Sequence, residues 1–457
     1  MKLSLDAALR ATGATLLDGD SAPASLRVST DTRTLEGGDT FVALRGERYD
    51  GHDFVAEAVR RGAALLVLQR ADARVPGTAA MVVEDTTRAY MALAGAARAL
   101  FGGKVVAITG SAGKTTTKAF LTQLLATTYG DRALAAPENE NNEIGVSKLL
   151  LTASNESHDV LVVEMGARHH GDVAPLVEIA RPQIGILTNV GEAHLEIMGS
   201  RERLEETKWA LFSGGARAVL NAADEVSRRR AATLARSPHW FAAELPRDVA
   251  PFETLTAFDG EGRVVGRATG RSAAYEVDVH VPGLHNRANL AAAIAGAIEL
   301  GVPLERLLPQ IPLVRLPHGR YDRIPVAGGI ALIYDAYNAN ASGMIAALDA
   351  FATETATRRI AVLASMAELG AESSALHERV GAHAAGKVDV LLVRGEHAPE
   401  LARGAKRGGL EAQQIVVVGT NVQAARWLRE HARPDDVVLL KGSRKYKLEE
   451  IVEELRT

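Results

Sequence analysis

Short apolar runs alternate with amphipathic stretches along most of this chain. Between residues 103 and 314 the apolar runs are nearly continuous, which is typical of strands buried on both faces of a mostly parallel sheet. The amphipathic stretches between them predict helices on both faces, and thus a doubly wound α/β domain. The strands that the pattern predicts here are VVAIT, DVLVVEMG, IGILTNV and ARAVLN.

The N-terminal part shows the same layering on a smaller scale. Strand-like runs occur near Val28, at 41–44 and at 64–68, and a helical stretch between them ends at Gly62. This pattern predicts a small α/β domain.

The C-terminal part again alternates apolar runs with helical stretches, which predicts a Rossmann-like α/β domain. The runs are IALIYDAYNAN, RIAVLASM, VDVLLVRG, QQIVVVG and DVVLLKGS. Short alternating stretches such as AAYEVDVHV, between 236 and 282, predict an antiparallel excursion. We therefore expect three α/β domains, at residues 1–102, 103–314 and 315–457.

The stretch VVAITGSAGKTTTK at 105–118 joins a buried strand to a helix through a glycine turn. Gly110 and Gly113 allow positive φ angles, so that successive N–H groups converge on an anion at the helix N-terminus. Lys114 offers a charge to the β- and γ-phosphates of a nucleotide, and Thr115 offers an oxygen ligand to Mg²⁺. The common loop begins with a further glycine, where Ile108 stands here. We expect a shorter phosphate loop, whose nucleotide-binding residues are Gly110, Ser111, Ala112, Gly113, Lys114, Thr115 and Thr116.

Two further predicted strands also end in polar residues. Glu164 closes the apolar run LVV, and TNVGEAH follows the next strand and ends at His194. Ligands of open α/β sheets collect at the carboxyl ends of strands, so these endings converge on the loop. A hard cation beside a triphosphate favours an oxygen ligand such as Glu164, and His194 suits a second metal. A structural, hydrogen-bonded role is the alternative for both residues.

Four other residues have a structural interpretation, and three of them have a functional one as well. Lys208, in the helical RERLEETKWALF, is by itself a solvated helix lysine. Asn286 and Asn289 open an alanine-rich helix, where they either cap it or hydrogen-bond an adenine edge. Asp335 follows a buried strand, where it either holds ribose hydroxyls or forms a turn.

Composition narrows the function classes. With 52 basic and 56 acidic residues the formal net charge is -4, which argues against broad nucleic-acid binding. The chain has no cysteine, so disulfides and thiolate metal sites are excluded. The first residues, MKLSLDAALRATGATLL, do not resemble a signal peptide, and no apolar run is long enough for a membrane span. We expect a cytoplasmic protein without membrane insertion.

Several motifs together resemble those of the Mur ligases, the ATP-dependent amide-forming enzymes of peptidoglycan precursor synthesis. The resemblance covers nearly the whole chain and rests on TGSAGKTTTK, the Glu164 strand end, TNVGEAH, ETKWALF, HNRANLAAA and the HGR at 318–320. It implies ATP and Mg²⁺ as cofactors and an acid–amino acid ligase activity.

Within that family, ENENNEIGV, DAYNANASGM and MAELG are similar to the member that adds D-alanyl-D-alanine to UDP-N-acetylmuramoyl-tripeptide. The sister that adds the third amino acid usually carries an Asn-Pro-Arg motif, which this chain lacks. That sister, a regulatory homologue without ligase activity, and a phosphate-loop kinase or GTPase are the alternatives. We expect a monomer, and the sequence leaves open whether the tripeptide ends in diaminopimelate or lysine.

The resemblance assigns roles residue by residue. Lys114, Lys208 and His194 are implied to be catalytic. Lys208 matches the family's carbamylated lysine, which is an anion able to ligate magnesium. The implied metal ligands are Thr115, Glu164, His194 and Lys208; further nucleotide contacts are Asn289, Arg320 and Asp335; and substrate-binding candidates are Asp31, Arg33, Asp50, His52 and Asn142.

Two departures from the family pattern affect the third domain. Ala341 stands where proline is usual after YNAN, which should loosen a turn. Ala364-Ser365 stands where Gly-Asp is usual, which removes a carboxylate. Both changes put recognition of the incoming dipeptide in doubt and leave the phosphate machinery intact.

Overall fold

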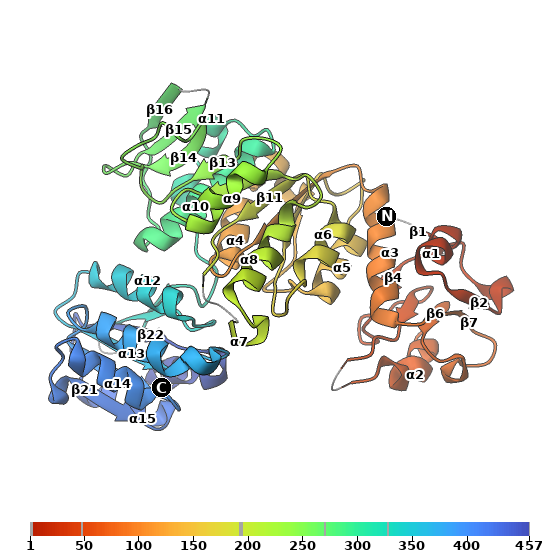
Figure 1. Ribbon diagram of the computed structural model, residues 1–457. Helices are drawn as coiled ribbons and strands as arrows, with labels where there is room; N and C mark the ends of the chain where they lie inside the picture. Colours follow the sequence, from red (N-terminus) through yellow and green to blue (C-terminus); the bar gives the residue numbers. More distant parts are fainter. Residues whose placement is uncertain (1–2, 47–48, 192–194, 269–270, 327–328, 457) are drawn as a thin grey trace.

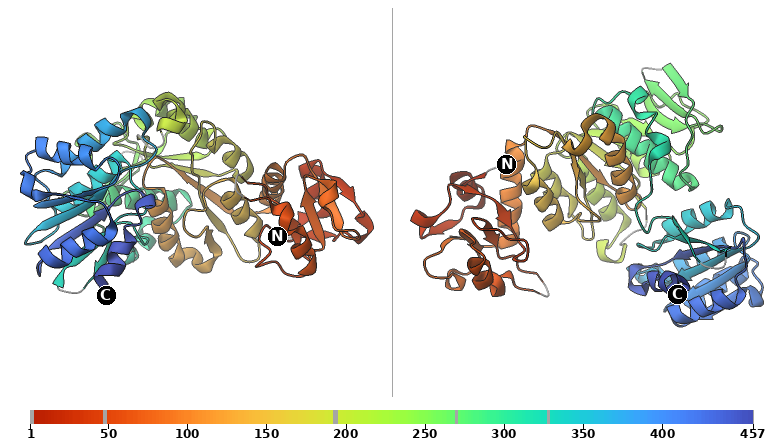
Figure 2. Two further views of the ribbon diagram at one scale, coloured as in Figure 1. Left: turned by 90° about the horizontal axis from the view of Figure 1, so that it is seen from below. Right: turned by 180° about the vertical axis from the view of Figure 1, so that it is seen from behind.

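The computed structural model describes residues 3–46, 49–191, 195–268, 271–326 and 329–456. In the described residues, three large sheets, each covered by helices, follow one another along the chain, and the strands β1 (Leu3–Ser4) and β3 (Ser25–Leu26) form a further two-stranded sheet (Figure 1). The prediction of three α/β domains is thereby confirmed. The N-terminal and C-terminal domains attach at opposite ends of the central one, as the two further views also show (Figure 2).

The N-terminal domain is built on a five-stranded sheet. Its elements are β1 (Leu3–Ser4), α1 (Leu5–Thr12), β2 (Thr15–Leu17), β3 (Ser25–Leu26), β4 (Val28–Ser29), β5 (Thr40–Val42), α2 (Val55–Arg60), β6 (Leu65–Leu68), β7 (Ala79–Val82) and α3 (Thr86–Leu100). The sheet order is β2-β7-β6-β5-β4, parallel except for β2. Helix α3 stands between this sheet and the central domain, where it packs against α1 on one side (Figure 1).

The central domain carries nine strands in the order β16-β15-β14-β13-β12-β11-β8-β10-β9. Its elements are β8 (Lys104–Thr109), α4 (Lys114–Tyr129), β9 (Ala133–Ala135), α5 (Glu143–Thr152), β10 (Val160–Glu164), α6 (Val173–Ala180), β11 (Ile184–Leu187), α7 (Leu195–Met198), α8 (Arg201–Trp209), β12 (Arg217–Asn221), α9 (Glu225–Arg230), β13 (His239–Phe241), β14 (Thr254–Phe258), β15 (Val264–Ala268), β16 (Arg271–Tyr275), α10 (Gly283–Glu299) and α11 (Leu304–Leu307). The four strands predicted from continuous apolar runs are β8, β10, β11 and β12.

Side chains of β8 alternate between two buried cores, which explains its unbroken apolar sequence. Val105 and Ala107 pack with α5 and α6 on one face, whereas Val106 and Ile108 pack with α4 and α10 on the other. Strand β8 lies between β10 and β11 and is parallel to both. The chain therefore leaves the carboxyl end of β8 at a switch point of the sheet, which is the place where ligands bind in doubly wound folds.

The predicted excursion between 236 and 282 is only partly antiparallel. Strands β15 and β16 pair antiparallel with β14, as expected. Strands β13 and β14 instead continue the parallel sheet beyond β12, so the prediction was wrong for them. A strand as short as the three residues of β13 carries too little periodicity to reveal its direction.

The C-terminal domain contains a six-stranded sheet in the order β17-β18-β22-β19-β20-β21, parallel except for the edge strand β17. Its elements are β17 (Asp322–Pro325), β18 (Ala331–Tyr334), α12 (Ala341–Ala352), β19 (Arg359–Ala364), α13 (Ser373–Ala384), β20 (Val390–Arg394), α14 (Ala398–Arg407), β21 (Ile415–Val418), α15 (Asn421–His431), β22 (Val437–Lys441) and α16 (Glu449–Arg456). Helices α12 to α14 cover one face, and α15 and α16 cover the other.

The connection from the central to the C-terminal domain is tied to α4. The Gln123 side chain accepts a hydrogen bond from the Arg315 N–H (2.8 Å) and donates one to the Arg315 carbonyl (2.8 Å). A few residues after these two hydrogen bonds, Gly319 and Tyr321 have positive φ angles of 74° and 57°. The chain thus turns sharply just beyond a residue that is fixed to the phosphate-loop helix.

Candidate active site

The phosphate loop leaves β8 and enters α4 in the geometry that its glycines predict. Gly110 has φ 150° and Gly113 has φ 84°, and Gly113 is the N-cap of α4. A Cβ on Gly110 would lie 1.8 Å from Thr188 Oγ1, and one on Gly113 would lie 2.2 Å from Asn289 Oδ1. Both positions therefore require glycine for conformation and for space.

Lys114 curls back over this loop. Its Nζ donates a hydrogen bond to the Gly110 carbonyl (2.8 Å), which places the ammonium group beside the backbone N–H groups of the turn. Burial lowers the pKa of Lys114, and the nearby Glu164 carboxylate opposes that shift. The loop thus holds a positive charge at a helix N-terminus, where phosphate anions are favoured.

Glu164 ends β10 beside the loop and is 1 % exposed. Its Oε1 accepts hydrogen bonds from Thr115 Oγ1 (3.2 Å) and Asn141 Nδ2 (2.8 Å). Among the described residues its Oε2 has no hydrogen-bond partner, and it lies 3.5 Å from Lys118 Nζ, which donates to the carbonyls of Ala136 and Glu138. A buried carboxylate oxygen without a hydrogen bond, next to a threonine hydroxyl, fits a site for a hard cation.

Lys208 lies in the last turn of α8 and is 1 % exposed. Burial, together with the charge of Lys114, lowers the pKa of Lys208 well below its usual value. The solvated helix lysine suggested by its local sequence is thus excluded. Such a shift increases the share of Lys208 that is unprotonated, and hence nucleophilic.

Three of the four predicted metal ligands, Thr115, Glu164 and Lys208, lie among the described residues. His194 lies outside the described residues. Within the part of the chain that is described, no cluster of three or more His, Asp or Glu side chains forms a ready metal site. The roles of Thr115, Glu164, His194 and Lys208 as metal ligands therefore remain predictions.

The segment after β11 supports the loop in a way that its sequence did not reveal. Thr188 Oγ1 donates a hydrogen bond to the Ala112 carbonyl (2.6 Å), and Asn189 Oδ1 accepts one from the Ala112 N–H (3.1 Å). The Gly191 N–H donates to Ser111 Oγ (2.9 Å). These bonds shape the cradle itself, because they hold its backbone from the neighbouring strand end.

Helix α10 brings Asn289 against the loop, where it contacts Gly113 and lies 3.4 Å from Thr117 Oγ1. The capping interpretation of the two asparagines was wrong, because Pro282 is the N-cap of α10 and makes no side-chain cap. Asn286 instead donates from Nδ2 to the Pro282 carbonyl (3.0 Å), one turn back. Asn289 thus lies beside the phosphate loop, and its contact with a nucleotide stays a prediction.

Two predicted nucleotide contacts come from the C-terminal domain. Arg320 stacks over Tyr337 at 4.3 Å, and its buried Nε has no hydrogen-bond partner among the described residues. Asp335 forms a buried ion pair with Lys441 (2.8 Å), which excludes a simple turn-forming role. Arg320 thus offers a donor to a ligand, whereas the Asp335 carboxylate is already engaged.

The phosphate loop, Glu164 and Arg320 line one cleft of about 830 Å³ between the central and C-terminal domains, whereas Lys208, Asn289 and Asp335 are not among its lining residues. The central domain contributes the loop, Glu164 and the 139–143 segment; the C-terminal domain contributes Arg320, Tyr337, the 338–340 segment and the 367–369 segment. Arg168 and Glu368 pair across it (3.0 Å). The predicted Asn142 lines this cleft, although its side chain caps α5 by accepting from the Gly145 N–H (3.0 Å).

The candidate substrate residues of the N-terminal domain lie in turns. Asp31 accepts hydrogen bonds from the backbone and guanidinium of Arg33, which lower the pKa of Asp31 to about 2. Asp50 accepts from the His52 N–H (3.0 Å) and contacts its Nδ1 (2.6 Å), while the buried His52 Nε2 accepts from the Gln69 N–H (2.9 Å). These groups satisfy one another, so the structure gives them a structural role and leaves substrate binding untested.

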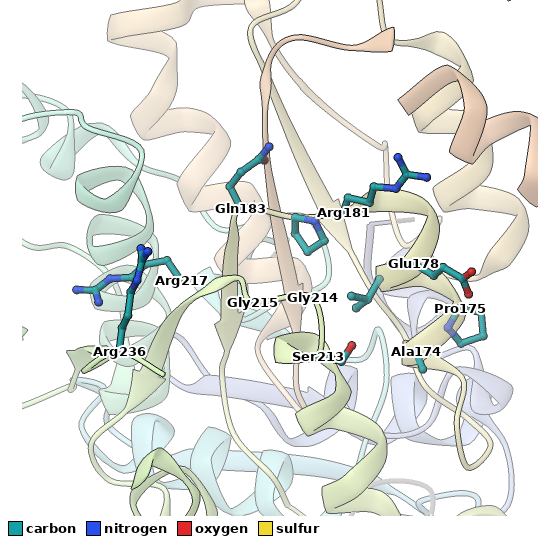
Figure 3. Close-up of a pocket in the computed structure, with 12 residues that line it drawn as sticks. Ala174, Pro175, Glu178, Arg181, Gln183, Ser213, Gly214, Gly215, Arg217 and Arg236 are labelled. Carbon is teal, nitrogen blue, oxygen red and sulfur yellow. The ribbon is translucent and has the colours of Figure 1, made fainter. Parts of the chain in front are cut away.

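A second hollow, of about 890 Å³, lies at the opposite edge of the central sheet, where β11 and β12 begin (Figure 3). Arg217 and Arg236 stand on one side of it, and Arg181 and Glu178 on the other. Arg217 is engaged by Glu299 (3.0 Å) and by the Ser237 carbonyl (2.5 Å). The hollow is remote from the phosphate loop, so we assign the chemistry to the cleft.

A glycine loop at the end of an inner strand of a doubly wound sheet, with a lysine and a buried carboxylate beside it, defines a phosphate-loop nucleotide-binding protein. Family models for Mur ligases match most of this chain: the family's catalytic domain over residues 27–98, the middle domain over 108–297 and the glutamate ligase domain over 319–444. The chain belongs to the Mur ligase family. The predicted resemblance and the ATP-dependent ligase class are confirmed.

Curated relatives agree with this assignment. A UDP-N-acetylmuramoyl-tripeptide--D-alanyl-D-alanine ligase from Escherichia coli (strain K12) is 34% identical over 437 residues, which cover 94% of this chain and 93% of that protein. The protein of the same name from Bacillus subtilis (strain 168) is 31% identical over 443 residues, covering 94% and 92%.

Solved structures share the whole fold. MurF from Acinetobacter baumannii matches with a TM-score of 0.86 and 27% identity, covering 100% of this chain and 99% of that one. MurF ligase from Thermotoga maritima in complex with ADP matches with a TM-score of 0.80 and 27% identity, covering 96% and 98%. In the described part of this chain, no helix is both long and apolar enough to cross a membrane.

Proposed function

We propose that this chain joins D-alanyl-D-alanine to UDP-N-acetylmuramoyl-tripeptide at the expense of ATP. The observation that carries the proposal is the cleft between the central and C-terminal domains, in which Lys114 and Glu164 lie at one phosphate loop. The buried Lys208 is close enough to Lys114 for the two charges to interact. The names of the relatives from Escherichia coli and Bacillus subtilis support this choice of substrates.

The reaction proceeds in two steps. A carboxylate oxygen of the tripeptide attacks the γ-phosphorus of ATP, ADP leaves, and an acyl phosphate forms. The amine nitrogen of the dipeptide then attacks the acyl carbon, phosphate leaves with the bonding electrons, and the nitrogen loses a proton to give the amide. Two anions meet in the first step, so Lys114 and the loop N–H groups matter more than a strong base.

Glu164 and Thr115 are the residues that would hold Mg²⁺, with His194 as a further candidate ligand. The ion would supply positive charge beside the phosphates. Oε2 of Glu164 supports this assignment, because this buried oxygen has no hydrogen bond among the described residues and only the ion pair with Lys118 at 3.5 Å offsets its charge. Asn141 keeps the other oxygen in place from the 139–143 segment.

Lys208 would contribute as a carbamate. Its uncharged amine adds to the carbon of CO₂ and releases one proton, so a buried neutral amine is replaced by an anion close to Lys114. The lowered pKa of Lys208 supports this step, because only the unprotonated amine reacts. The carbamate anion would attract the ammonium group of Lys114, whereas a protonated Lys208 is disfavoured by it.

The domains divide the substrates among them. We propose that residues 1–102 bind the UDP moiety, that 103–314 bind ATP, and that 315–457 close the nucleotide site and bind the dipeptide. Asp31 and Arg33 form the more exposed of the two N-terminal pairs and are the nearer candidates for direct contact. We further propose a monomer that works in the cytoplasm, where ATP is supplied.

The decisive experiment measures phosphate release by the purified chain with ATP, UDP-N-acetylmuramoyl-tripeptide and D-alanyl-D-alanine, each omitted in turn. We expect release only when all three are present, and a product heavier than the tripeptide substrate by the dipeptide less one water. Phosphate release that instead requires a single amino acid, together with a precursor that carries only two amino acids, would identify the sister activity. Release without any amine would identify a phosphate-loop hydrolase.

A further inference from the structure

The segment Ser365–Gly370, which follows β19, forms part of the C-terminal wall of the cleft. Ala367, Glu368 and Leu369 line the cleft, and Glu368 has a left-handed φ of 61°. A non-glycine residue holds such a conformation only when its surroundings impose it. The groups that impose it are therefore important for the shape of this wall.

Two histidines fasten the start of this segment from behind. His377 Nε2 accepts a hydrogen bond from the Met366 N–H (2.8 Å), and His377 Nδ1 donates to the Ser373 carbonyl (2.6 Å). The His397 N–H donates to Ser365 Oγ (3.0 Å). The two imidazole rings stack at 4.4 Å, so both anchors belong to one unit.

The partners of His377 define its protonation. Because Nε2 accepts and Nδ1 donates, the ring is the neutral Nδ1–H tautomer. The side chain is fully buried, and burial lowers the pKa of His377, which keeps the accepting lone pair available at neutral pH. The ring does not line the cleft, so any effect on a substrate passes through residues 366–369.

Ser365, which stands where the family pattern has an aspartate, takes part in this anchoring. The residue is fully buried, and its N–H and Oγ both bond the Arg394 carbonyl. The carboxylate expected at this position from the family pattern would therefore meet backbone behind the wall and not the cleft. Recognition of the dipeptide is therefore expected to depend on the segment that Ser365 anchors and not on the Ser365 side chain itself.

We propose that His377 is a positioning residue for the amine substrate, holding Met366 so that Ala367–Leu369 form the wall against which the dipeptide binds. The inference rests on the proposed function. The amine substrate is assigned to this segment because the phosphate loop on one wall of the cleft takes the phosphates of ATP, whereas the segment belongs to the wall that the C-terminal domain contributes.

The test compares His377→Phe, which keeps a buried ring but lacks the acceptor, with His377→Gln, which retains an acceptor. We expect His377→Phe to raise the KM for D-alanyl-D-alanine about tenfold while the KM for ATP changes less than about twofold, because only one wall is displaced. His377→Gln should recover most of that loss. His383→Phe is the matched control: the residue lies on the same helix α13 but is paired with Asp349 (2.8 Å) away from the cleft.

Equal rises in both KM values, or a His377→Gln variant as impaired as His377→Phe, would show a merely structural role and overturn the proposal. Should His377→Phe not fold, His397→Ala removes the stacked ring and keeps the Met366 bond; it should raise the dipeptide KM about threefold, and no change would contradict the proposal. Wild-type protein without dipeptide-dependent phosphate release would instead refute the proposed function.

Discussion

The phosphate loop and two turns of the N-terminal domain are both clusters of polar residues between apolar strands. The turns carry Asp31, Arg33, Asp50 and His52. In the loop, polar groups point at a site that the backbone itself creates, and Glu164 keeps one oxygen without a hydrogen bond. In the turns, each carboxylate is bound by its own neighbours two residues on. Unfilled hydrogen-bonding capacity, more than the presence of charge, therefore separates a binding site from a well-made turn.

The largest loss should follow from Lys114→Ala, which removes the charge from the loop side of this comparison. We expect phosphate release to fall by about 10³-fold or more, since the lysine neutralises the phosphates during transfer. Steady-state phosphate release and circular dichroism together check the result. Lys406→Ala, on the exposed last turn of α14, is the control and should keep full activity; near-normal turnover of Lys114→Ala would refute the loop assignment.

Lys208→Ala should be the next most severe change, with a loss of about 10²–10³-fold, because it removes the carbamate and with it an anion beside the phosphates. A short carboxylic acid such as formate should restore part of the activity by placing an oxygen anion in the space left. The same acid should not help Lys114→Ala, which lacks a cation. A Lys208→Ala variant that works unaided would show that no carbamate is needed.

Gly113→Ala tests the shape of the loop without changing its charge. The new Cβ would collide with Asn289 Oδ1 at a position where φ is 84°, so we expect ATP affinity to fall about tenfold to a hundredfold. Gly130→Ala, at the other end of α4, also has a positive φ but nothing within 4 Å of its Cβ. It should cost stability only; equal ATP affinities in the two variants would mean that the Asn289 contact is unimportant.

His52→Ala tests the turn side of the comparison. The variant loses hydrogen bonds of a buried ring to Asp50 and to the Gln69 N–H, so the free energy of unfolding should fall by about 1–3 kcal/mol. The KM for the UDP substrate should change less than about threefold, since the ring serves the turn. Denaturant titration and substrate kinetics measure both quantities. His280→Ala, an exposed histidine beside Asp278, is the control; a large KM change without loss of stability would make His52 a direct substrate contact.

The sequence predicted those features whose physical cause is local. The loop followed from Gly110 and Gly113 between a strand and a helix, and β8, β10, β11 and β12 followed from unbroken apolar runs. The contact of Asn289 with Gly113 could not be predicted without the resemblance, because it joins residues far apart in the chain through the packing of α10 on α4. Likewise, the supporting bonds from Asn189 and the engagement of Asp335 by Lys441 depend on neighbouring strand ends, which periodicity does not pair.

The paired hydrogen bonds between Gln123 and the Arg315 backbone have a mechanical consequence. They fix the start of the C-terminal domain to α4, the helix whose first turn lies at the phosphate loop. A small tilt of α4 would therefore rotate the C-terminal domain. The rotation would shift Arg320 and the 367–369 segment, which lie across the cleft, by a larger distance. The bonds of Gln123 thereby link the nucleotide site to the wall on the other side of the cleft, alongside the Arg168–Glu368 ion pair that also joins the two domains.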